Sequence, residues 1–440
     1  MIKKKLNKYI LTNVLGMVST SLYILADTIF ISAKEGTNGI TALNLVLPIY
    51  GMINAIGSMI GIGSAINYSI IRCVDKENAN LYFANSINSI LLISLIFVAL
   101  GVFLPKQLLT MLGADEIILA TGSTYTKIVL CFAPFFMLNY TMTAFVRNDN
   151  APGIAMAATI VSGIFNIVFD YVFMFPLQMG MAGAALATGL SPVVSMLICL
   201  FHYLSSKNNI AFVMVLPSIK KLLAACKLGV VSFVGEISNA VTTLVFNFIL
   251  LKLIGNKAVA AYGIIANIAL IGTSLFNGVS QGLQPLASIS HGTQNIKEKK
   301  VILLQSLKIS IIIAILLILT IMLLSKNLVG IFNSKQSAEL ERYAGEGMRL
   351  YFLGFLFVSV NIVMAGFYSA TGKAVQSSVI AICRGIIFIS IFAMLFSYLF
   401  GIVGLWLSFL ASETATFILI IILNLITNNR KHSTKMVEST

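Results

Sequence analysis

Asn166-Ile-Val-Phe-Asp170-Tyr-Val-Phe-Met-Phe-Pro176-Leu-Gln-Met-Gly180-Met-Ala-Gly183-Ala-Ala-Leu-Ala-Thr188-Gly-Leu-Ser191 places a carboxylate inside an apolar run. A carboxylate in a membrane helix costs about 2.5–3.5 kcal/mol and normally faces a partner or a water-filled cavity. Asn166 precedes Asp170 by four residues, so both side chains share one helix face. After the turn at Pro176 and Gly180, small residues allow close packing of a returning helix, which brings Thr188 alongside. Their oxygens suit a proton or a hard monovalent cation; a polar helix contact without an ion is the alternative.

The composition predicts a multi-pass membrane protein. The 440 residues are 58% hydrophobic and 10% charged, with a mean hydropathy of +0.96, far from ordinary soluble composition. The net charge of +14 comes without the basic, aromatic-interleaved surface that nucleic acid requires. The five cysteines form no CxxC pair, so neither a disulfide framework nor zinc is indicated. The basic N-terminus precedes an apolar run without a cleavage site, and we expect a retained first membrane helix.

Apolar runs long enough to cross a bilayer, which takes about 20 residues, predict twelve membrane helices. The first six lie near 9–32, 38–71, 82–104, 121–146, 153–175 and 180–204. The second six lie near 222–252, 257–290, 301–324, 341–369, 375–399 and 401–426.

The distribution of basic residues predicts the orientation. With an even number of spans, both termini share one side, and that side then carries 19 Lys and Arg against 9 on the other, with Arg384 left in mid-membrane. Because basic residues concentrate in cytoplasmic loops, we expect both termini in the cytoplasm and the chain in the plasma membrane.

An internal repeat at an offset of 221 residues predicts two related lobes. Gly57 and Gly61 match Gly278 and Gly282, while Gly180 and Gly183 match Gly401 and Gly404. We therefore expect an all-α fold of two six-helix lobes, related by a pseudo-two-fold axis along the membrane normal, around a central cleft for substrate. The expected divisions are an N-terminal lobe at 1–204, a cytoplasmic linker at 205–227, a C-terminal lobe at 228–427 and a cytoplasmic tail at 428–440.

Three polar residues of the first lobe fall at a similar depth. At 1.5 Å per residue, Asp27 lies about 10 Å below Lys34, Asp170 about 9 Å below Pro176, and Thr188 about 12 Å below Gly180. We therefore group Asp27 with Asn166, Asp170 and Thr188 as a site for a proton or a sodium ion. Two neighbouring carboxylates cannot both be ionised at low cost, so we expect one of them to take up and release a proton.

The second lobe carries different polar residues, so we expect ion handling to differ between the lobes. Glu236, with Asn239 one turn further on, is the expected contact for a cationic substrate, although Glu236 could instead accept a hydrogen bond from Asn239 or a neighbouring helix. Arg384 and Glu413 fall near the middle of the last two spans, and we favour a buried ion pair that fixes helix packing. Further candidates for the second-lobe polar site are Gln281, Gln284 and Asn361.

Enzymatic signatures are missing from the sequence. It contains no Walker-type GxxxxGK[ST], no complete dinucleotide fingerprint and no HExxH. We expect His202, His291 and His432 to be solvated residues at helix ends or in the tail. The prediction is a non-enzymatic monomer without a cofactor or an ATPase subunit, driven by an ion gradient.

The chain resembles the multidrug and toxic compound extrusion transporters, within the superfamily that includes polysaccharide-lipid flippases. The resemblance covers nearly the whole chain and is carried by Leu25-Ala-Asp27-Thr-Ile-Phe30, the opening stretch, and Gly278-Val-Ser-Gln-Gly-Leu-Gln-Pro285 running into His291-Gly-Thr-Gln-Asn295. Val259-Ala-Ala-Tyr-Gly263 and Glu236-Ile-Ser-Asn239 look like the bacterial drug-efflux branch. The resemblance implies that Asp27, Asn166, Asp170 and Thr188 form the cation or proton site of the N-terminal lobe. The departures, Ile71-Arg72-Cys73-Val74 and Asn148-Asp149-Asn150, are expected to affect loops alone.

Three functions follow from these observations. The first is an antiporter that exports amphipathic, often cationic compounds in exchange for H⁺ or Na⁺ by alternating access. The second is a lipid-linked oligosaccharide flippase, which would need a cleft rich in Arg and Lys for pyrophosphate, where Arg384 stands nearly alone. The third is a receptor or scaffold, against which the repeat and the buried acids both argue.

Overall fold

The computed structural model describes residues 2–332 and 338–437, and its regular structure is helical throughout these residues. The N-terminal half contains α1 (Ile2–Ile71), α2 (Lys76–Phe103), α3 (Pro105–Met111), α4 (Glu116–Cys131), α5 (Ala133–Asn148), α6 (Pro152–Met174) and α7 (Gly180–Tyr203). The C-terminal half contains α8 (Ile219–Leu253), α9 (Asn256–Gly292), α10 (Ile296–Phe332), α11 (Ala338–Leu353), α12 (Phe355–Ala370), α13 (Ala374–Ile382), a π-helical turn (Cys383–Phe388) and α14 (Ile389–Val437). Residues 438–440 of the expected tail 428–440 lie outside the described residues.

Glycines in the left-handed region separate membrane helices that would otherwise be continuous. Gly36 (φ 62°) divides α1 into two arms, and Gly401 (φ 59°) divides α14 in the same way. Only a residue without a Cβ adopts this backbone conformation at little cost. Gly180, the repeat mate of Gly401, also has a positive φ of 52°, so the repeated glycines mark equivalent turns in the two halves.

Twelve membrane spans fit the described residues, as the sequence predicts. Nine helices are long and apolar enough to cross a membrane, and two bent helix pairs bring the number to eleven. One of the nine, Ala374–Ile426, is 53 residues long, about 80 Å as a helix. Because Gly401 turns the chain within it, this stretch supplies two crossings, which gives the twelfth span.

Two spans expected to be continuous are bent. The span expected at 121–146 consists of α4 and α5, which meet at 44°, and the span expected at 341–369 consists of α11 and α12, which meet at 45°. Pro134, the second residue of α5, cannot donate a backbone hydrogen bond to the preceding turn, so the helix is interrupted at Phe132. The second bend falls at Gly354, between α11 and α12.

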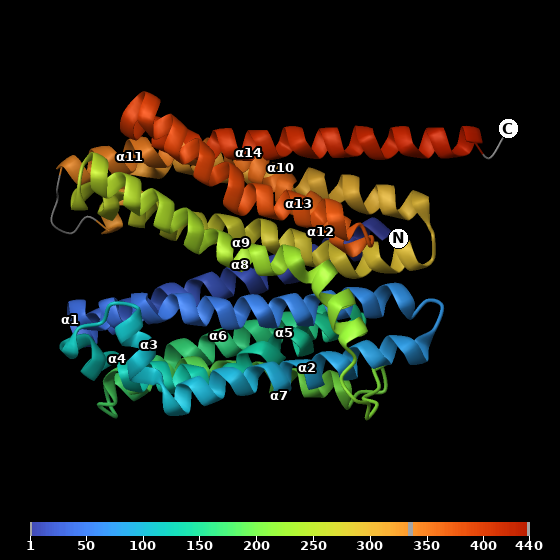
Figure 1. The fold of residues 1–440 in the computed structure, drawn as a ribbon, viewed down its shortest axis with the longest axis horizontal. Coiled ribbons are helices and arrows are strands. Elements are labelled where there is room, and N and C mark those ends of the chain that lie inside the picture. Colours follow the sequence, from blue (N-terminus) through green and yellow to red (C-terminus); the bar gives the residue numbers. More distant parts are fainter. Residues whose placement is uncertain (1, 333–337, 438–440) are drawn as a thin grey trace.

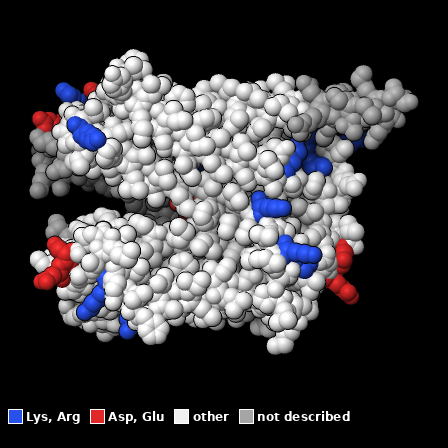
Figure 2. All heavy atoms as spheres, viewed as in Figure 1, with Lys and Arg blue, Asp and Glu red and all other residues white. Residues whose placement is uncertain are grey.

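The helices form two bundles with a hollow between them (Figures 1 and 2). α1–α7 make one bundle and α8–α14 the other, and the bundles meet where α1 packs against α8 and α9. Each bundle has its own large apolar core, one built around residues such as Phe136 and Met137 and the other around Trp406 and Phe355. Both termini lie toward the same end of the molecule, and the hollow opens at the other end.

Close backbone contacts seal the end that carries the termini. A Cβ on Gly63 would lie 2.0 Å from the carbonyl oxygen of Ala225, and one on Gly229 would lie 1.9 Å from that of Met59. Gly278 and Gly282 also pack closely on α1, where Cβ atoms would approach the Cα atoms of Val14 and Ile10 at 2.5 and 2.7 Å. The bundles are therefore locked together at one end and separated at the other.

Candidate functional site

Two carboxyl groups and their oxygen-bearing neighbours meet inside the N-terminal bundle. Asp170 and Asn166 project from one face of α6 and are fully buried, while Asp27 on the first arm of α1 and Thr188 on α7 are at least nine-tenths buried. The Asp27 and Asp170 carboxyl groups lie within hydrogen-bonding reach of each other, and Asn166 Nδ2 donates to Thr188 Oγ1 at 3.4 Å. The structure thus brings together the four residues grouped from the sequence.

Four oxygens of this cluster lack a donor among the described residues. Asp27 Oδ1, both carboxylate oxygens of Asp170 and Asn166 Oδ1 are buried without a hydrogen-bond partner among the described residues. A buried acceptor left unsatisfied is costly, and a buried carboxylate far more so. A proton shared between the carboxyl groups, or a small cation among the four oxygens, would satisfy them. We call Asp27, Asn166, Asp170 and Thr188 the oxygen cluster.

Tyrosine hydroxyls lie between the oxygen cluster and the second lobe. Tyr23, one turn before Asp27, lies next to Tyr50 on the second arm of α1. Tyr140 on α5 donates to Glu236 Oε1 on α8 at 3.4 Å, which joins the two bundles. Because Glu236 is exposed in the structure and aromatic rings attract organic cations, this group is suited to a flat cation in contact with water. The sequence does not predict a role for these tyrosines, because each looks like an ordinary residue of an apolar span.

The other second-lobe candidates do not gather around Glu236. Arg384 Nε lies 2.8 Å from Glu413 Oε1, and Asn361 Nδ2 donates to Glu413 Oε2 at 2.7 Å. Glu413 and Asn361 are buried, so this group is a packed ion pair inside the C-terminal bundle, as favoured from the sequence. Asn239 is exposed on the same helix as Glu236, and the partner that the structure gives Glu236 is Tyr140.

Gln281 belongs to the sealed end of the molecule. Its Oε1 accepts from Arg147 Nη1 at 2.7 Å, and the same guanidinium donates to Asn13 Oδ1 at 3.1 Å. Gln284, one turn further along α9, is buried. Arg147, in the last turn of α5, is buried and bridges the two lobes.

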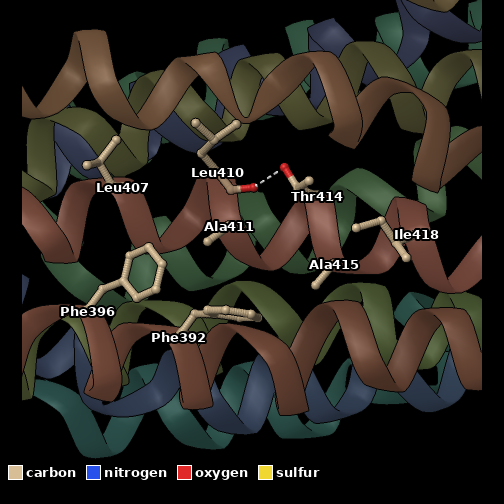
Figure 3. A pocket seen from close by; sticks show the side chains of 8 residues that line it. All are labelled: Phe392, Phe396, Leu407, Leu410, Ala411, Thr414, Ala415 and Ile418. Atoms are coloured by element: carbon tan, nitrogen blue, oxygen red, sulfur yellow. Dashed lines mark hydrogen bonds between the residues drawn. The ribbon is translucent and has the colours of Figure 1, made fainter.

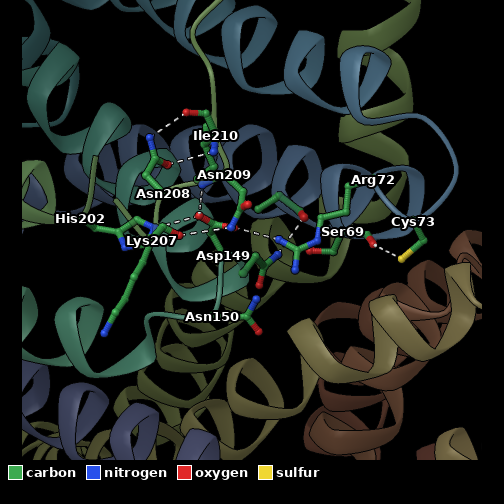
Figure 4. A network of polar contacts seen from close by, with 12 residues as sticks. Ser69, Arg72, Cys73, Asp149, Asn150, His202, Lys207, Asn208, Asn209 and Ile210 are labelled. Carbon is green, nitrogen blue, oxygen red and sulfur yellow. Dashed lines mark hydrogen bonds and ion pairs between the residues drawn. The ribbon is translucent and has the colours of Figure 1, made fainter. Parts of the chain in front are cut away.

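His202 lies at a helix end, as expected from the sequence, but it is not solvated, and Asp149 lies in the turn after α5, as expected for a loop residue. Both are buried, and His202 Nε2 lies 2.9 Å from Asp149 Oδ2 (Figure 4). Arg72 Nη1 lies 3.0 Å from Asp149 Oδ1, and Asn209 donates to Asp149 from its backbone N–H at 2.8 Å. The two departures from the family pattern, around Arg72 and around Asp149, therefore meet in one buried network, which the sequence could not reveal because its members are far apart in the chain.

A further hollow lies between the two arms of α14 (Figure 3). Its lining is apolar except for Thr414, whose hydroxyl donates back to the carbonyl of Leu410. The lining residues are Phe392, Phe396, Leu407, Leu410, Ala411, Thr414, Ala415 and Ile418. The lining residues therefore offer no charged group to an ion.

The fold and the site define a two-lobed, multi-pass membrane protein with a polar hollow between its lobes. The sequence profile of the MatE family matches residues 13–172 and 232–407, and the chain belongs to this family.

Relatives and solved structures agree with this assignment. The chain is 27% identical over 403 residues to the multidrug export protein MepA of Staphylococcus saprophyticus, covering 91% of this chain and 88% of that protein. It is 25% identical over 415 residues to MepA of Staphylococcus aureus strain MRSA252, covering 93% and 91%. A solved outward-facing multidrug resistance MATE family transporter of the MOP superfamily is similar in fold, with a TM-score of 0.88 at 22% identity over 99% of this chain and 97% of that one.

Proposed function

We propose that the protein exports amphipathic, often cationic compounds in exchange for H⁺ or Na⁺. Family membership and relatives named as multidrug export proteins support export. The observation that carries the coupling is the oxygen cluster, whose buried acceptors have no donor among the described residues. A proton or sodium ion bound there would neutralise the carboxyl groups, and its release would restore the charge.

Ion binding would act on the first arm of α1. Asp27 is on this arm and Asp170 is on α6, so neutralisation removes the repulsion between two helices of the N-terminal lobe. The same arm packs against α9 of the other lobe through Gly278 and Gly282. A change in the position of the arm would therefore alter the contact between the lobes and shift the population of the two cleft orientations.

Substrate recognition would occur in the hollow. Glu236 supplies a carboxylate in contact with water, and Tyr140 holds one of its oxygens. A flippase acting on pyrophosphate-linked sugars is less well supported, because Arg384 is already paired with Glu413. The proposed protein is a monomer in the plasma membrane, with both termini in the cytoplasm. Reporter fusions at the two ends test that orientation.

Transport in proteoliposomes under imposed pH and sodium gradients tests the coupling. Asp27→Asn and Asp170→Asn should each abolish gradient-driven dye transport, while the gradient that drives the wild type identifies the ion. Asp75→Asn is the matched control, because Asp75 caps α2 by accepting from Asn78 N and asparagine caps equally well. Full gradient-driven transport by both cluster variants would reject the proposal.

A further inference from the structure

The segment between α7 and α8, residues 204–218, is held along α2 by hydrogen bonds. Asn209 N donates to Asp149 Oδ2 at 2.8 Å, and Ala211 N donates to Asn80 Oδ1 at 3.2 Å. Asn88 Nδ2 donates to the carbonyl oxygen of Val215 at 2.7 Å. Ser218 N then donates to Asn85 Oδ1. The segment thus advances along α2 as far as Asn88 and returns to Asn85.

The turning point of the segment lies within the expected membrane span of α2. That span begins near residue 82, so Asn88 is six residues, or about 9 Å, inside it. Irregular backbone at this depth is tolerated only where its polar groups find partners in the protein. Asn80, Asn85 and Asn88 supply such partners, which explains why asparagines occur in this apolar helix.

Apolar side chains point away from the protein at the turning point. Met214 is 93% exposed and Leu216 is 91% exposed, on either side of Val215. The segment is anchored behind them by Ile210, which is 4% exposed, and by Phe212, whose ring lies 6.5 Å from that of Phe83. Met214 and Leu216 therefore project outward from a segment whose backbone is fixed by hydrogen bonds to α2.

We propose that residues 211–217 insert into the lipid leaflet at the end of the molecule that carries the termini. Acyl chains would cover Met214 and Leu216, and the exposed Lys207 and Lys220 would lie at the level of the phosphate groups. Lipid is the occupant because the turning point lies beside a membrane-spanning helix, at a depth where its neighbours in the membrane are lipid molecules. The proposal requires membrane insertion of α2 and is independent of the transported compound.

Tryptophan fluorescence in nanodiscs tests the insertion. Met214→Trp places a reporter at the turning point, and Val74→Trp places one on the 85%-exposed turn between α1 and α2. The single native tryptophan, Trp406, is buried in the C-terminal core and gives the background signal. We expect lipids brominated near the headgroup to quench the fluorescence of Trp at position 214, and aqueous iodide to leave that fluorescence unquenched. The opposite pattern is expected for position 74.

Leu216→Trp provides an independent reporter if Met214→Trp does not fold. In the Met214→Trp background, Asn88→Ala removes the bond to Val215 and should reduce quenching by brominated lipid. Quenching of both reporters by iodide to the extent seen at position 74 would place the segment in water and overturn the proposal. Protection from both quenchers would indicate a protein contact and would overturn it equally.

Discussion

Replacing Gly63 by alanine should shift the protein away from the conformation described above. The new Cβ would lie 2.0 Å from the carbonyl oxygen of Ala225, 2.8 Å from its carbon and 2.9 Å from Gly229 N. All three atoms are backbone, so no side chain can rotate to make room. The second arm of α1 and α8 would have to move apart by about 1 Å or more to approach ordinary van der Waals separation.

The magnitude follows from the cost of overpacking. Inserting a methyl group into such a contact costs about 1–3 kcal/mol, and each 1.4 kcal/mol changes a population ratio about tenfold. If the alternative conformation separates these helices, the ratio of the two conformations should change by about 5- to 150-fold. If the wild type prefers the present conformation by about 100 to 1, a change near 150-fold would leave the two conformations about equally populated.

Distance measurements between the lobes check this prediction. Spin labels attached to an unnatural amino acid at Lys106 and Lys252, which are exposed in different lobes, would report the opening of the hollow. Gly63→Ala should increase the population with the shorter distance. Gly51→Ala on the same arm is the control, because its Cβ would meet no atom within 4 Å among the described residues. An unchanged distance distribution in folded Gly63→Ala protein would refute the reasoning.

Two further predictions concern stability, measured by thermal unfolding in detergent. Asp149→Ala should lower the free energy of unfolding by about 3–5 kcal/mol, because it leaves the partly buried Arg72 without its carboxylate. The control, Asp75→Ala, removes a helix cap and should lower it by about 1 kcal/mol. Equal melting temperatures for these two variants would contradict the assigned role of Asp149. Glu413→Leu should destabilise the protein more than the double variant Arg384→Met/Glu413→Leu, because only the single variant leaves a guanidinium unpaired. A lower melting temperature for the double variant would show that the pair does not act as a unit.

The polar residues of membrane spans were the most predictable part of the site. Asp27 and Asp170 stand out because ionisable groups are expensive in an apolar helix. Asn166 shares a helix face with Asp170, and helical rise places Thr188 at a similar depth. The repeat glycines were also informative, since Gly180 and Gly401 share the backbone conformation that a turn requires. Hydropathy and spacing therefore predict the fold class and the existence of the oxygen cluster.

Contacts between distant segments were decided by the tertiary structure. Arg147, Asp149 and His202 look like loop or helix-end residues in the sequence, because nothing local shows that helix packing buries them. Tyr140 meets Glu236 only when two bundles face each other across the hollow. Local sequence determines which segments enter the membrane, since that depends on the transfer free energy of each helix. Which polar groups become partners depends on how the helices pack, and residues as far apart as Arg72 and Asp149 acquire their roles only there.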